Sequence, residues 1–188
     1  MPVIKAAGNW SRVISRRCSR RCPRRMDMRR LAAPTDFDRV YDIYMHESVV
    51  PFLGFDPMPR EAFGKVFDPL FESGCFYVYE VDGEVMGFYK AQRHVGRTAH
   101  VAYLGTLAVA PEAQGRGIAL GMMQDALARL QRAGITRVEL TVEADNPRAI
   151  TFYERLGFVH EGTQRAAYKR ASDAGYVDEL MYGLLHDG

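Results

Sequence analysis

The chain alternates between segments in which apolar residues recur every three or four positions and segments in which they recur every second position. The longer period first appears after residue 34, which predicts a helix of about 14 residues that begins at Thr35. Asp38 follows Thr35 by three positions, as in a capping box. A second helix is expected over about residues 59–72. The aromatic residues of both helices are more typical of a core than of a ligand site.

The shorter period predicts most of the remaining chain to be strand. Strands are expected at about residues 28–33, 76–80, 85–92, 100–109, 137–143, 158–169 and 176–185, with further helices at about 118–132 and 147–156. The pair Asp82-Gly83 favours a tight hairpin between the second and third strands. The predicted order is β, α, α, β, β, β, α, β, α, β, β, without an internal repeat.

Charge separates the start of the chain from the rest. The 188 residues are enough for one domain with one core. Residues 1–25 hold eight Lys or Arg and no acid, which leaves 17 basic against 23 acidic residues beyond them. We interpret residues 1–25 as a disordered arm, or as a mis-started N-terminus before Met26 or Met28, and residues 26–188 as the domain. The alternatives are an arm that binds nucleic acid or membrane phosphates, and a transit peptide.

Other features of the sequence argue against a membrane-spanning, a secreted or a zinc-binding protein. No run approaches the roughly 20 apolar residues of a membrane span, and the start lacks the apolar stretch of a secretory signal, so we expect a cytoplasmic protein. Cys18, Cys22 and Cys75 are odd in number and lack the further Cys or His of a zinc site. We expect free thiols and no metal centre.

The most informative segment runs from an apolar strand through a glycine-bearing loop into a helix. Gly115 and Gly117 let the backbone turn without Cβ obstruction, so that successive N–H groups can point at one anion beside a helix N-terminus. The loop positions are Gln114, Gly115, Arg116, Gly117, Ile118 and Ala119. This pattern predicts a diphosphate cradle, to which Arg116 can add a charged contact. The alternative is that the glycines only allow close helix packing.

A second signature follows about 30 residues later, at residues 146–158. Together the two segments resemble the GNAT acetyltransferase superfamily, on the residues Gln114, Gly117, Ala119, Asn146, Ala149, Tyr153 and the ending Leu156-Gly157-Phe158. The resemblance covers about residues 26–186. It implies an α/β (α+β) fold with a central mixed, mostly antiparallel, splayed sheet flanked by helices, and acetyl-CoA as cosubstrate.

The resemblance also implies a site. Leu107 and Val109 would bond the pantetheine arm through their backbone in the gap between splayed strands, and Asn146 would lie beside it while capping the following helix. Tyr153 would lie near the thioester sulfur, where its phenol can protonate the departing thiolate. Packing as a core residue is the alternative role for Tyr153.

The general base is less defined. Some members of the family carry a glutamate six residues before the valine of the cofactor strand, and Tyr103 holds that position here. A neutral phenol is a poor base, so a water chain leads to another group or the amine arrives deprotonated. Glu143, Glu139 and His100 are the candidates for the relay.

The expected reaction is direct attack of a primary amine on acetyl-CoA in a ternary complex. The last strands resemble those of bacterial acetyltransferases that act on free amino acids or related small molecules. Polyamines, aminoglycosides, and a protein N-terminus or lysine are alternative acceptors. A non-catalytic acetyl-CoA sensor and a nucleic-acid-associated protein are alternatives from other classes. The resemblance also points to a homodimer, without an identifiable interface, and we expect neither a membrane nor a nucleic-acid partner.

Overall fold

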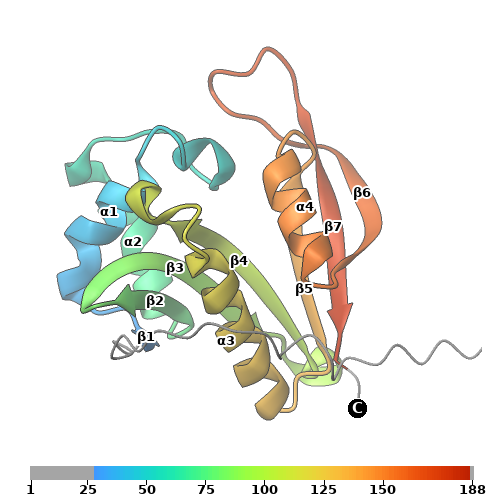
Figure 1. The fold of residues 1–188 in the computed structure, drawn as a ribbon. Helices are drawn as coiled ribbons and strands as arrows, with labels where there is room; N and C mark the ends of the chain where they lie inside the picture. The colour runs from blue at the N-terminus through green and yellow to red at the C-terminus, as the bar shows by residue number, and fades with distance from the viewer. Residues whose placement is uncertain (1–27, 187–188) are drawn as a thin grey trace, which may run out of the picture.

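A computed structural model describes residues 28–186 (Figure 1). The basic segment 1–25, with Cys18 and Cys22, lies outside the described residues. The strands are β1 (Met28–Leu31), β2 (Phe76–Val81), β3 (Glu84–Arg93), β4 (Val101–Val109), β5 (Arg137–Glu143), β6 (Val159–Tyr168) and β7 (Val177–Leu185). The helices are α1 (Phe37–Tyr44), α2 (Gly64–Glu72), α3 (Ile118–Arg132) and α4 (Pro147–Arg155), so that the order of elements agrees with the prediction.

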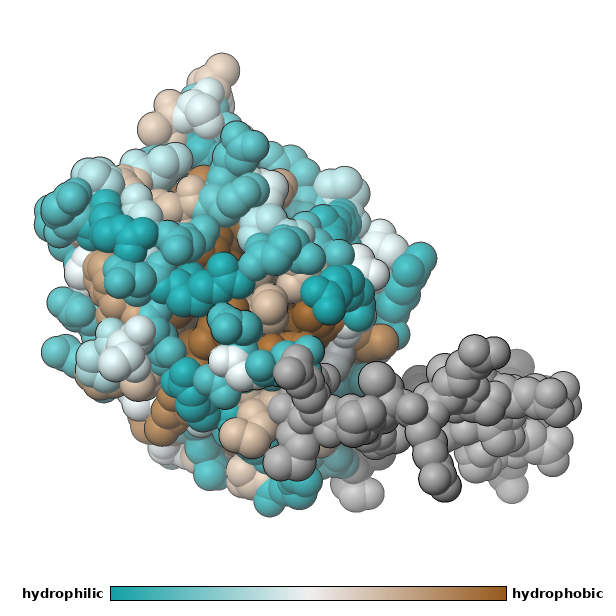
Figure 2. Space-filling model, turned by 60° about the vertical axis from the view of Figure 1, so that its left-hand side comes forward, coloured by the Kyte–Doolittle hydropathy of each residue, from teal (hydrophilic) through white to brown (hydrophobic). Residues whose placement is uncertain are grey.

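All seven strands form one sheet in the order β1-β2-β3-β4-β5-β7-β6. Only β4 and β5 are parallel, and each of the other neighbouring pairs is antiparallel. Within the described chain, no helix is long and apolar enough to cross a membrane. Figure 2 shows hydrophilic side chains over most of one face, with apolar surface confined to small patches between them. The mixed, mostly antiparallel sheet is confirmed.

Helices cover both faces of the N-terminal half of the sheet (Figure 1). Phe88 of β3 stacks on Tyr44 of α1, with ring centroids 5.9 Å apart. The preceding residue, Gly87, points to the opposite face, where a Cβ would approach Met122 of α3. Tyr44, Phe88 and Met122 are almost completely buried. The core therefore lies in two layers, one on each side of β3.

The first helix is shorter than predicted. It ends at Tyr44, after eight residues, and a 3-10 turn at Val50–Phe52 follows. Pro51 cannot donate a backbone hydrogen bond, and the His46 ring accepts from the backbone N–H of Ser48, so both favour a turn over a continued helix. Val49 is nevertheless buried, as its spacing predicts, because the turn returns it to the core.

The predicted helix starts also needed correction. Thr35 does not begin the helix, because it lies in a 3-10 turn, Pro34–Asp36, and α1 starts at Phe37. The acid of the capping contact is Asp36 and not Asp38, since Asp36 Oδ2 accepts from the backbone N–H of Ala33 at 2.7 Å. The second helix begins at Gly64 and not near residue 59, because a separate 3-10 turn at Arg60–Ala62 precedes it. Both errors concern element boundaries, which depend on local hydrogen bonds that several neighbouring polar residues can make.

A buried ion pair fixes the first strand to the chain that follows it. Asp36 is 5% exposed and accepts two hydrogen bonds from the Arg30 guanidinium, at 2.6 and 2.8 Å. Arg30 also donates to Glu80 on the neighbouring strand β2, at 2.8 Å. Burial acts to raise the pKa of Asp36, but the hydrogen bonds from Arg30 and Ala33 outweigh it and hold the pKa below its ordinary value.

The variant Asp36→Asn should lower the free energy of unfolding by about 2 kcal/mol at neutral pH, because charge-assisted hydrogen bonds of the buried carboxylate are lost. This loss of unfolding free energy should have its full size above the usual Asp pKa of about 3.9. It should shrink as the pH falls through the lower pKa that Asp36 has in the folded protein. Urea unfolding from pH 7 to pH 3 measures both effects. Asp42→Asn is the matched control, since Asp42 meets Arg60 at the surface with 53% of its side chain exposed. An equal loss in both variants would contradict the role of the Arg30–Asp36 pair.

Candidate active site

The sheet opens between its two parallel strands. The pairing of β4 with β5 covers Val101↔Arg137, Ala102↔Val138 and Tyr103↔Glu139, and the strands then diverge toward the top of Figure 1. Beyond Tyr103, the edge of β4 that faces β5 has no strand partner among residues 28–186. The splayed sheet is thereby confirmed. The backbone N–H and C=O groups of β4 along this edge are available to another molecule.

The opening forms a cleft of about 420 Å³. This volume is within the usual size range of small-molecule sites. The walls of the cleft come from β4, from the end of β5, from α4, from the loop at residues 48–54, from the glycine loop and the start of α3, and from one residue each of β6 and β7. The residues that the argument below uses are Tyr103, Leu107, Val109, Gln114, Ala119, Thr141, Glu143, Asn146, Arg148, Tyr153, Tyr168 and Glu179. Segments far apart in the sequence thus meet around one space.

The glycine loop forms the N-terminal end of α3. Gly115 and Gly117 adopt left-handed conformations, with φ of 75° and 80°, and an added Cβ at either position would meet no atom within 4 Å. The glycines therefore serve the backbone turn and not close helix packing, which answers the alternative raised by the sequence. Gly117 caps a helix of 15 residues without a side-chain cap, so the first N–H groups of α3, from Ile118 and Ala119 onward, are open to an anion.

The loop is tied to the neighbouring elements through Gln114. Its Nε2 donates to the carbonyl of Val109 at 3.3 Å, and its Oε1 accepts from Arg148 of α4 at 2.9 Å. Arg116 lies exposed in the loop. Two arginines therefore lie on or beside the turn that the sequence predicts to bind a diphosphate.

Strand β4 carries a bulge at the centre of the cleft. Thr106 has a φ of 50°, and its strand loses register with β3 between the pairs Gly105↔Lys90 and Ala108↔Phe88. Leu107 follows the bulge and lines the cleft together with Val109. The irregular backbone lies where the strand has no partner on the cleft side.

Helix α4 begins at the other wall of the cleft. The Asn146 side chain caps it, since Oδ1 accepts from the backbone N–H of Ala149 at 3.1 Å, which confirms the predicted cap. Tyr153 lies on the same helix, 9% exposed, and its ring packs edge-on against Phe158 at 5.8 Å. Burial raises the pKa of the Tyr153 phenol, and nearby Glu143 raises it further. The phenol is therefore neutral at physiological pH and can donate a proton.

Glu143 ends β5 inside the cleft and is 7% exposed. Burial raises the pKa of its carboxyl above the ordinary value. Glu179, its direct partner on β7, acts in the same direction, whereas a backbone hydrogen bond and the Asn146 side chain act against it. Among the three relay candidates, this carboxyl is the one that lines the cleft.

Tyr103 stands at the point where β4 and β5 separate. Its hydroxyl forms a hydrogen bond with Thr141 Oγ1 across the two strands, at 3.1 Å. Its ring lies over Gly105, where a Cβ would come within 2.6 Å of Cε1. Tyr103 therefore closes the floor of the cleft, and Gly105 provides the space for its ring.

Two of the relay candidates lie elsewhere. Glu139 pairs with Arg137 at 3.4 Å and lies 3.6 Å from the His94 ring, outside the residues that line the cleft. His100 is exposed and precedes β4 at the closed end of the splay. Within residues 28–186, no group of three or more His, Cys, Asp or Glu side chains is placed to hold a metal ion.

The sequence did not single out Glu179 or Thr141. Thr141 lies between Glu139 and Glu143, on the face of β5 that they share by alternation, whereas the place of Glu179 in the cleft depends on how β5 pairs with β7. Tyr168, at the end of β6, also lines the cleft. Cross-strand pairing is the signal that would have identified Glu179.

A polar clasp closes the cleft beside Tyr168. The Tyr168 hydroxyl donates to the carbonyl of Leu53 at 2.5 Å, and Arg170 Nε donates to the carbonyl of Pro51 at 2.6 Å. The Arg170 guanidinium also binds both carboxylate oxygens of Asp145, at 2.8 and 3.0 Å. The clasp thus joins the loop after α1 to the turn that carries Asn146.

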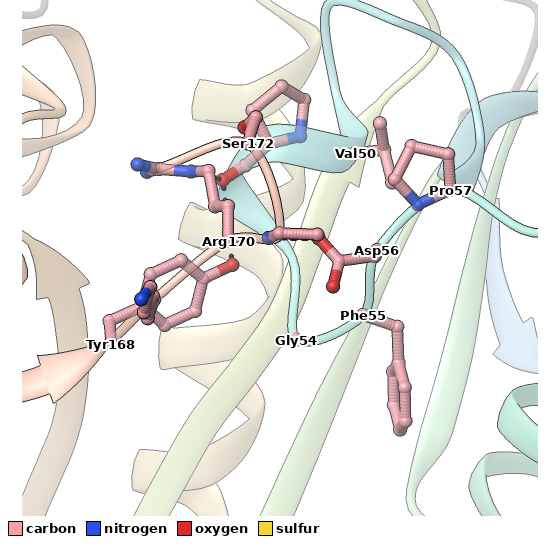
Figure 3. Close-up of a pocket in the computed structure, with 11 residues that line it drawn as sticks. Val50, Gly54, Phe55, Asp56, Pro57, Tyr168, Arg170 and Ser172 are labelled. Carbon is pink, nitrogen blue, oxygen red and sulfur yellow. Dashed lines mark hydrogen bonds between the residues drawn. The ribbon is translucent and has the colours of Figure 1, made fainter. Parts of the chain in front are cut away.

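A second, smaller cavity of about 280 Å³ lies next to the clasp (Figure 3). It shares Gly54 and Tyr168 with the cleft. In Figure 3, Arg170 and Asp56 come from two different loops at the cavity, and the Arg170 guanidinium points away from Asp56. The hydrogen bond from the backbone N–H of Ala171 to Asp56 Oδ1, 2.9 Å long, closes its rim.

Comparison with known proteins gives consistent results. The model of the acetyltransferase (GNAT) family matches residues 37–158. Mycothiol acetyltransferase of Streptomyces coelicolor is 36% identical over 103 residues, which are 54% of this chain and 33% of that protein. Mycothiol acetyltransferase of Pseudarthrobacter chlorophenolicus is 35% identical over 124 residues, which are 65% and 33% of the two chains. The chain spans about a third of the length of these relatives.

Solved structures share the fold at lower identity. The ribosomal-protein-S18-alanine N-acetyltransferase of Escherichia coli matches with a TM-score of 0.65 and 22% identity, over 85% of this chain and 94% of that one. The structure of yncA from Salmonella typhimurium, with its cofactor acetyl-CoA, matches with a TM-score of 0.67 and 17% identity, over 87% and 95% of the two chains. At these identities the likeness shows the fold alone.

The titration of Glu143 tests the electrostatics of the cleft directly. Its carboxyl pKa, followed by ¹³C NMR of labelled glutamate, should lie above the ordinary value because the side chain is buried. Glu179→Gln should lower this pKa by removing a neighbouring charge, and Asn146→Ala should raise it by removing a stabilising contact. Shifts of the opposite sign would show that the environment of Glu143 is not the one described.

Proposed function

Because the chain belongs to the acetyltransferase (GNAT) family, we propose that it transfers an acetyl group from acetyl-CoA to a primary amine of a small molecule, by direct attack in a ternary complex. The observation that carries this proposal is the cleft between the splayed strands β4 and β5, with the buried Tyr153 and Glu143 on its wall. A neutral phenol and a carboxyl of raised pKa are the acid and base that acyl transfer to an amine requires.

The residues around the cleft fit acetyl-CoA. The diphosphate would bind the N–H groups of residues 114–119, where the two glycines turn the backbone toward one point at the start of α3. Arg116 would add charge at this position, as would Arg148, which Gln114 holds in place. The backbone of Leu107 and Val109 would bond the pantetheine arm along the free edge of β4, opposite Asn146.

When bound, acetyl-CoA supplies the acetyl group as an activated thioester. Glu143 takes the proton that the amine loses, either directly or through a water molecule. The Tyr103 hydroxyl, which Thr141 orients at the floor of the cleft, would position that water. As the new C–N bond replaces the C–S bond, Tyr153 gives its phenolic proton to the departing sulfur. A proton returns to Tyr153 from solvent when the products leave.

The size of the cleft favours a small acceptor. The similar proteins support the same class, because they are mycothiol acetyltransferases. Acetylation of a protein N-terminus or lysine is the second candidate, and the clasp over the cleft argues against it, since a polypeptide would need the Tyr168–Leu53 contact to open. A non-catalytic acetyl-CoA sensor is the third candidate, and it would be consistent with a tyrosine at position 103.

One assay separates these candidates. The purified protein is mixed with acetyl-CoA and with panels of small amines, polyamines, aminoglycosides and short peptides, and release of free thiol is followed. Turnover with small amines above the rate with peptides supports the proposal. Turnover with peptides alone would favour the second candidate, and acetyl-CoA binding without any turnover would favour the sensor.

Tyr153→Phe should lower kcat by about 10²- to 10⁴-fold, because the variant lacks the proton donor for the thiolate. Its affinity for acetyl-CoA, measured by calorimetry, should change little, since the ring and its packing remain. Tyr182→Phe is the matched control, because Tyr182 is also buried but does not line the cleft. Its hydroxyl donates to Glu154 at 3.2 Å. Unchanged kcat in Tyr153→Phe would exclude the acid role.

A further inference from the structure

Charge is distributed unevenly over the walls of the cleft. Within the described chain, the charged residues that line it are Arg148, Glu143 and Glu179. Arg148 donates to Gln114 and lies beside the glycine loop, at the part of the cleft proposed for the phosphates. The wall formed by the ends of β5 and β7 therefore presents two carboxylates and no lining cation.

The two carboxylates are direct neighbours. Glu143 and Glu179 are partners in the antiparallel pair β5–β7, so their side chains leave the sheet on the same face. Like charges at such positions repel each other, and the cation whose charge acts against this repulsion at Glu143 is Arg170, which does not line the cleft. A positively charged ligand would remove this unfavourable interaction, whereas a negatively charged one would increase it.

The nearest buried cation is already engaged. Arg170 lines the second cavity and not the cleft, and its side chain is 12% exposed. Its Nε donates to the carbonyl of Pro51, and its two terminal nitrogens donate to Asp145, with a further contact to Asp173 at 3.2 Å. Four of the five N–H groups of Arg170 are thereby engaged, so an acceptor carboxylate could bind it through two N–H groups only by displacing one of these partners.

The remaining polar groups near the acidic pair offer little to an anion. The Tyr168 hydroxyl donates to the carbonyl of Leu53, and the Asn146 side chain accepts from its own helix and contacts Glu143. Phe52, Leu53 and Gly54 of the neighbouring loop contribute apolar surface or backbone, and the Ser48 hydroxyl already contacts the His46 ring. The Tyr153 phenol near Glu143 is neutral. A carboxylate placed here would therefore lose its hydration without gaining a charged partner.

From these observations we infer that the acceptor is a primary amine without a neighbouring carboxylate, such as an amino-acid amide, and that Glu179 is the residue that imposes this choice. The inference rests on the proposed function and narrows its substrate class. It departs from the expectation of free amino acids, whose carboxylate would lie next to the reacting amine and therefore close to the acidic pair.

Glu179 rather than Glu143 is the residue to test. Glu143 is the base of the proposed reaction, so its replacement would stop turnover with every acceptor. Glu179 is half-buried at the cleft wall and has no assigned role in proton transfer. Its charge does raise the pKa of Glu143, but that effect is the same for both acceptors and cancels in a ratio of their rates, so a change at Glu179 can alter the choice between acceptors while catalysis continues.

The experiment measures kcat/KM for acetyl transfer to leucine and to leucinamide. The two differ in that leucinamide has an uncharged amide in place of the carboxylate. The wild-type protein should prefer leucinamide by about 100-fold, because juxtaposed like charges disfavour leucine. Glu179→Gln should reduce this ratio by about tenfold, and Glu179→Lys should reduce it further, with the KM for acetyl-CoA unchanged in both. Comparing ratios between variants cancels the different reactivities of the two amines. Glu154→Gln, a carboxylate of α4 outside the cleft lining, should leave the ratio unchanged.

Binding of the two acceptors, followed by NMR without turnover, separates the inference from the proposed function. Selective binding of leucinamide that is lost in Glu179→Gln supports the inference even if no acetyl group is transferred, in which case only the proposed function fails. Equal use or equal binding of leucine and leucinamide by the wild-type protein overturns the inference, as does a ratio that Glu179→Gln leaves unchanged. Thermal melting shows that the variants are folded, and Glu179→Gln should not melt earlier, because it relieves a repulsion.

Discussion

The short pairing between β4 and β5 determines the rest of the architecture. After three residue pairs the two strands diverge, and each then bonds on its other side, β4 to β3 and β5 to β7. Along the facing edges of β4 and β5, backbone N–H and C=O groups are left that can form hydrogen bonds with a ligand. A sheet that stayed closed along its length would leave no space for the cleft, and a complete separation would leave two halves with no fixed relation.

Polar contacts span the opening at its floor and at its roof. Tyr103 and Thr141 join the strands at the floor, and the Tyr168 and Arg170 side chains join the loop after α1 to the C-terminal half at the roof. Arg170 also holds Asp145, which lies between Glu143 and the helix cap Asn146. The roof of the proposed acceptor end thus depends on two contacts between segments more than 100 residues apart, whereas the proposed diphosphate site depends mainly on one continuous loop and the helix that follows it.

This difference explains how much the sequence could predict. The order of elements and the buried faces of the helices followed from periodicity, and the turn at Gly115 and Gly117 and the Asn146 cap followed from local backbone chemistry. The end of α1 was wrong because Pro51 and the His46–Ser48 contact overrode the apolar spacing. Glu179 was missed because only the pairing of β5 with β7 brings it to Glu143, and sequence alternation does not fix which strands pair.

The claim that acetyl-CoA occupies the opening between β4 and β5 can be tested most directly with a crystal structure of the protein with acetyl-CoA. The account predicts the diphosphate at the N–H groups of residues 114–119 and the pantetheine along Leu107 and Val109. It also predicts the thioester sulfur within hydrogen-bond reach of the Tyr153 hydroxyl. A pantetheine arm in the cavity between Asp56 and Arg170, or a diphosphate away from the start of α3, would contradict it.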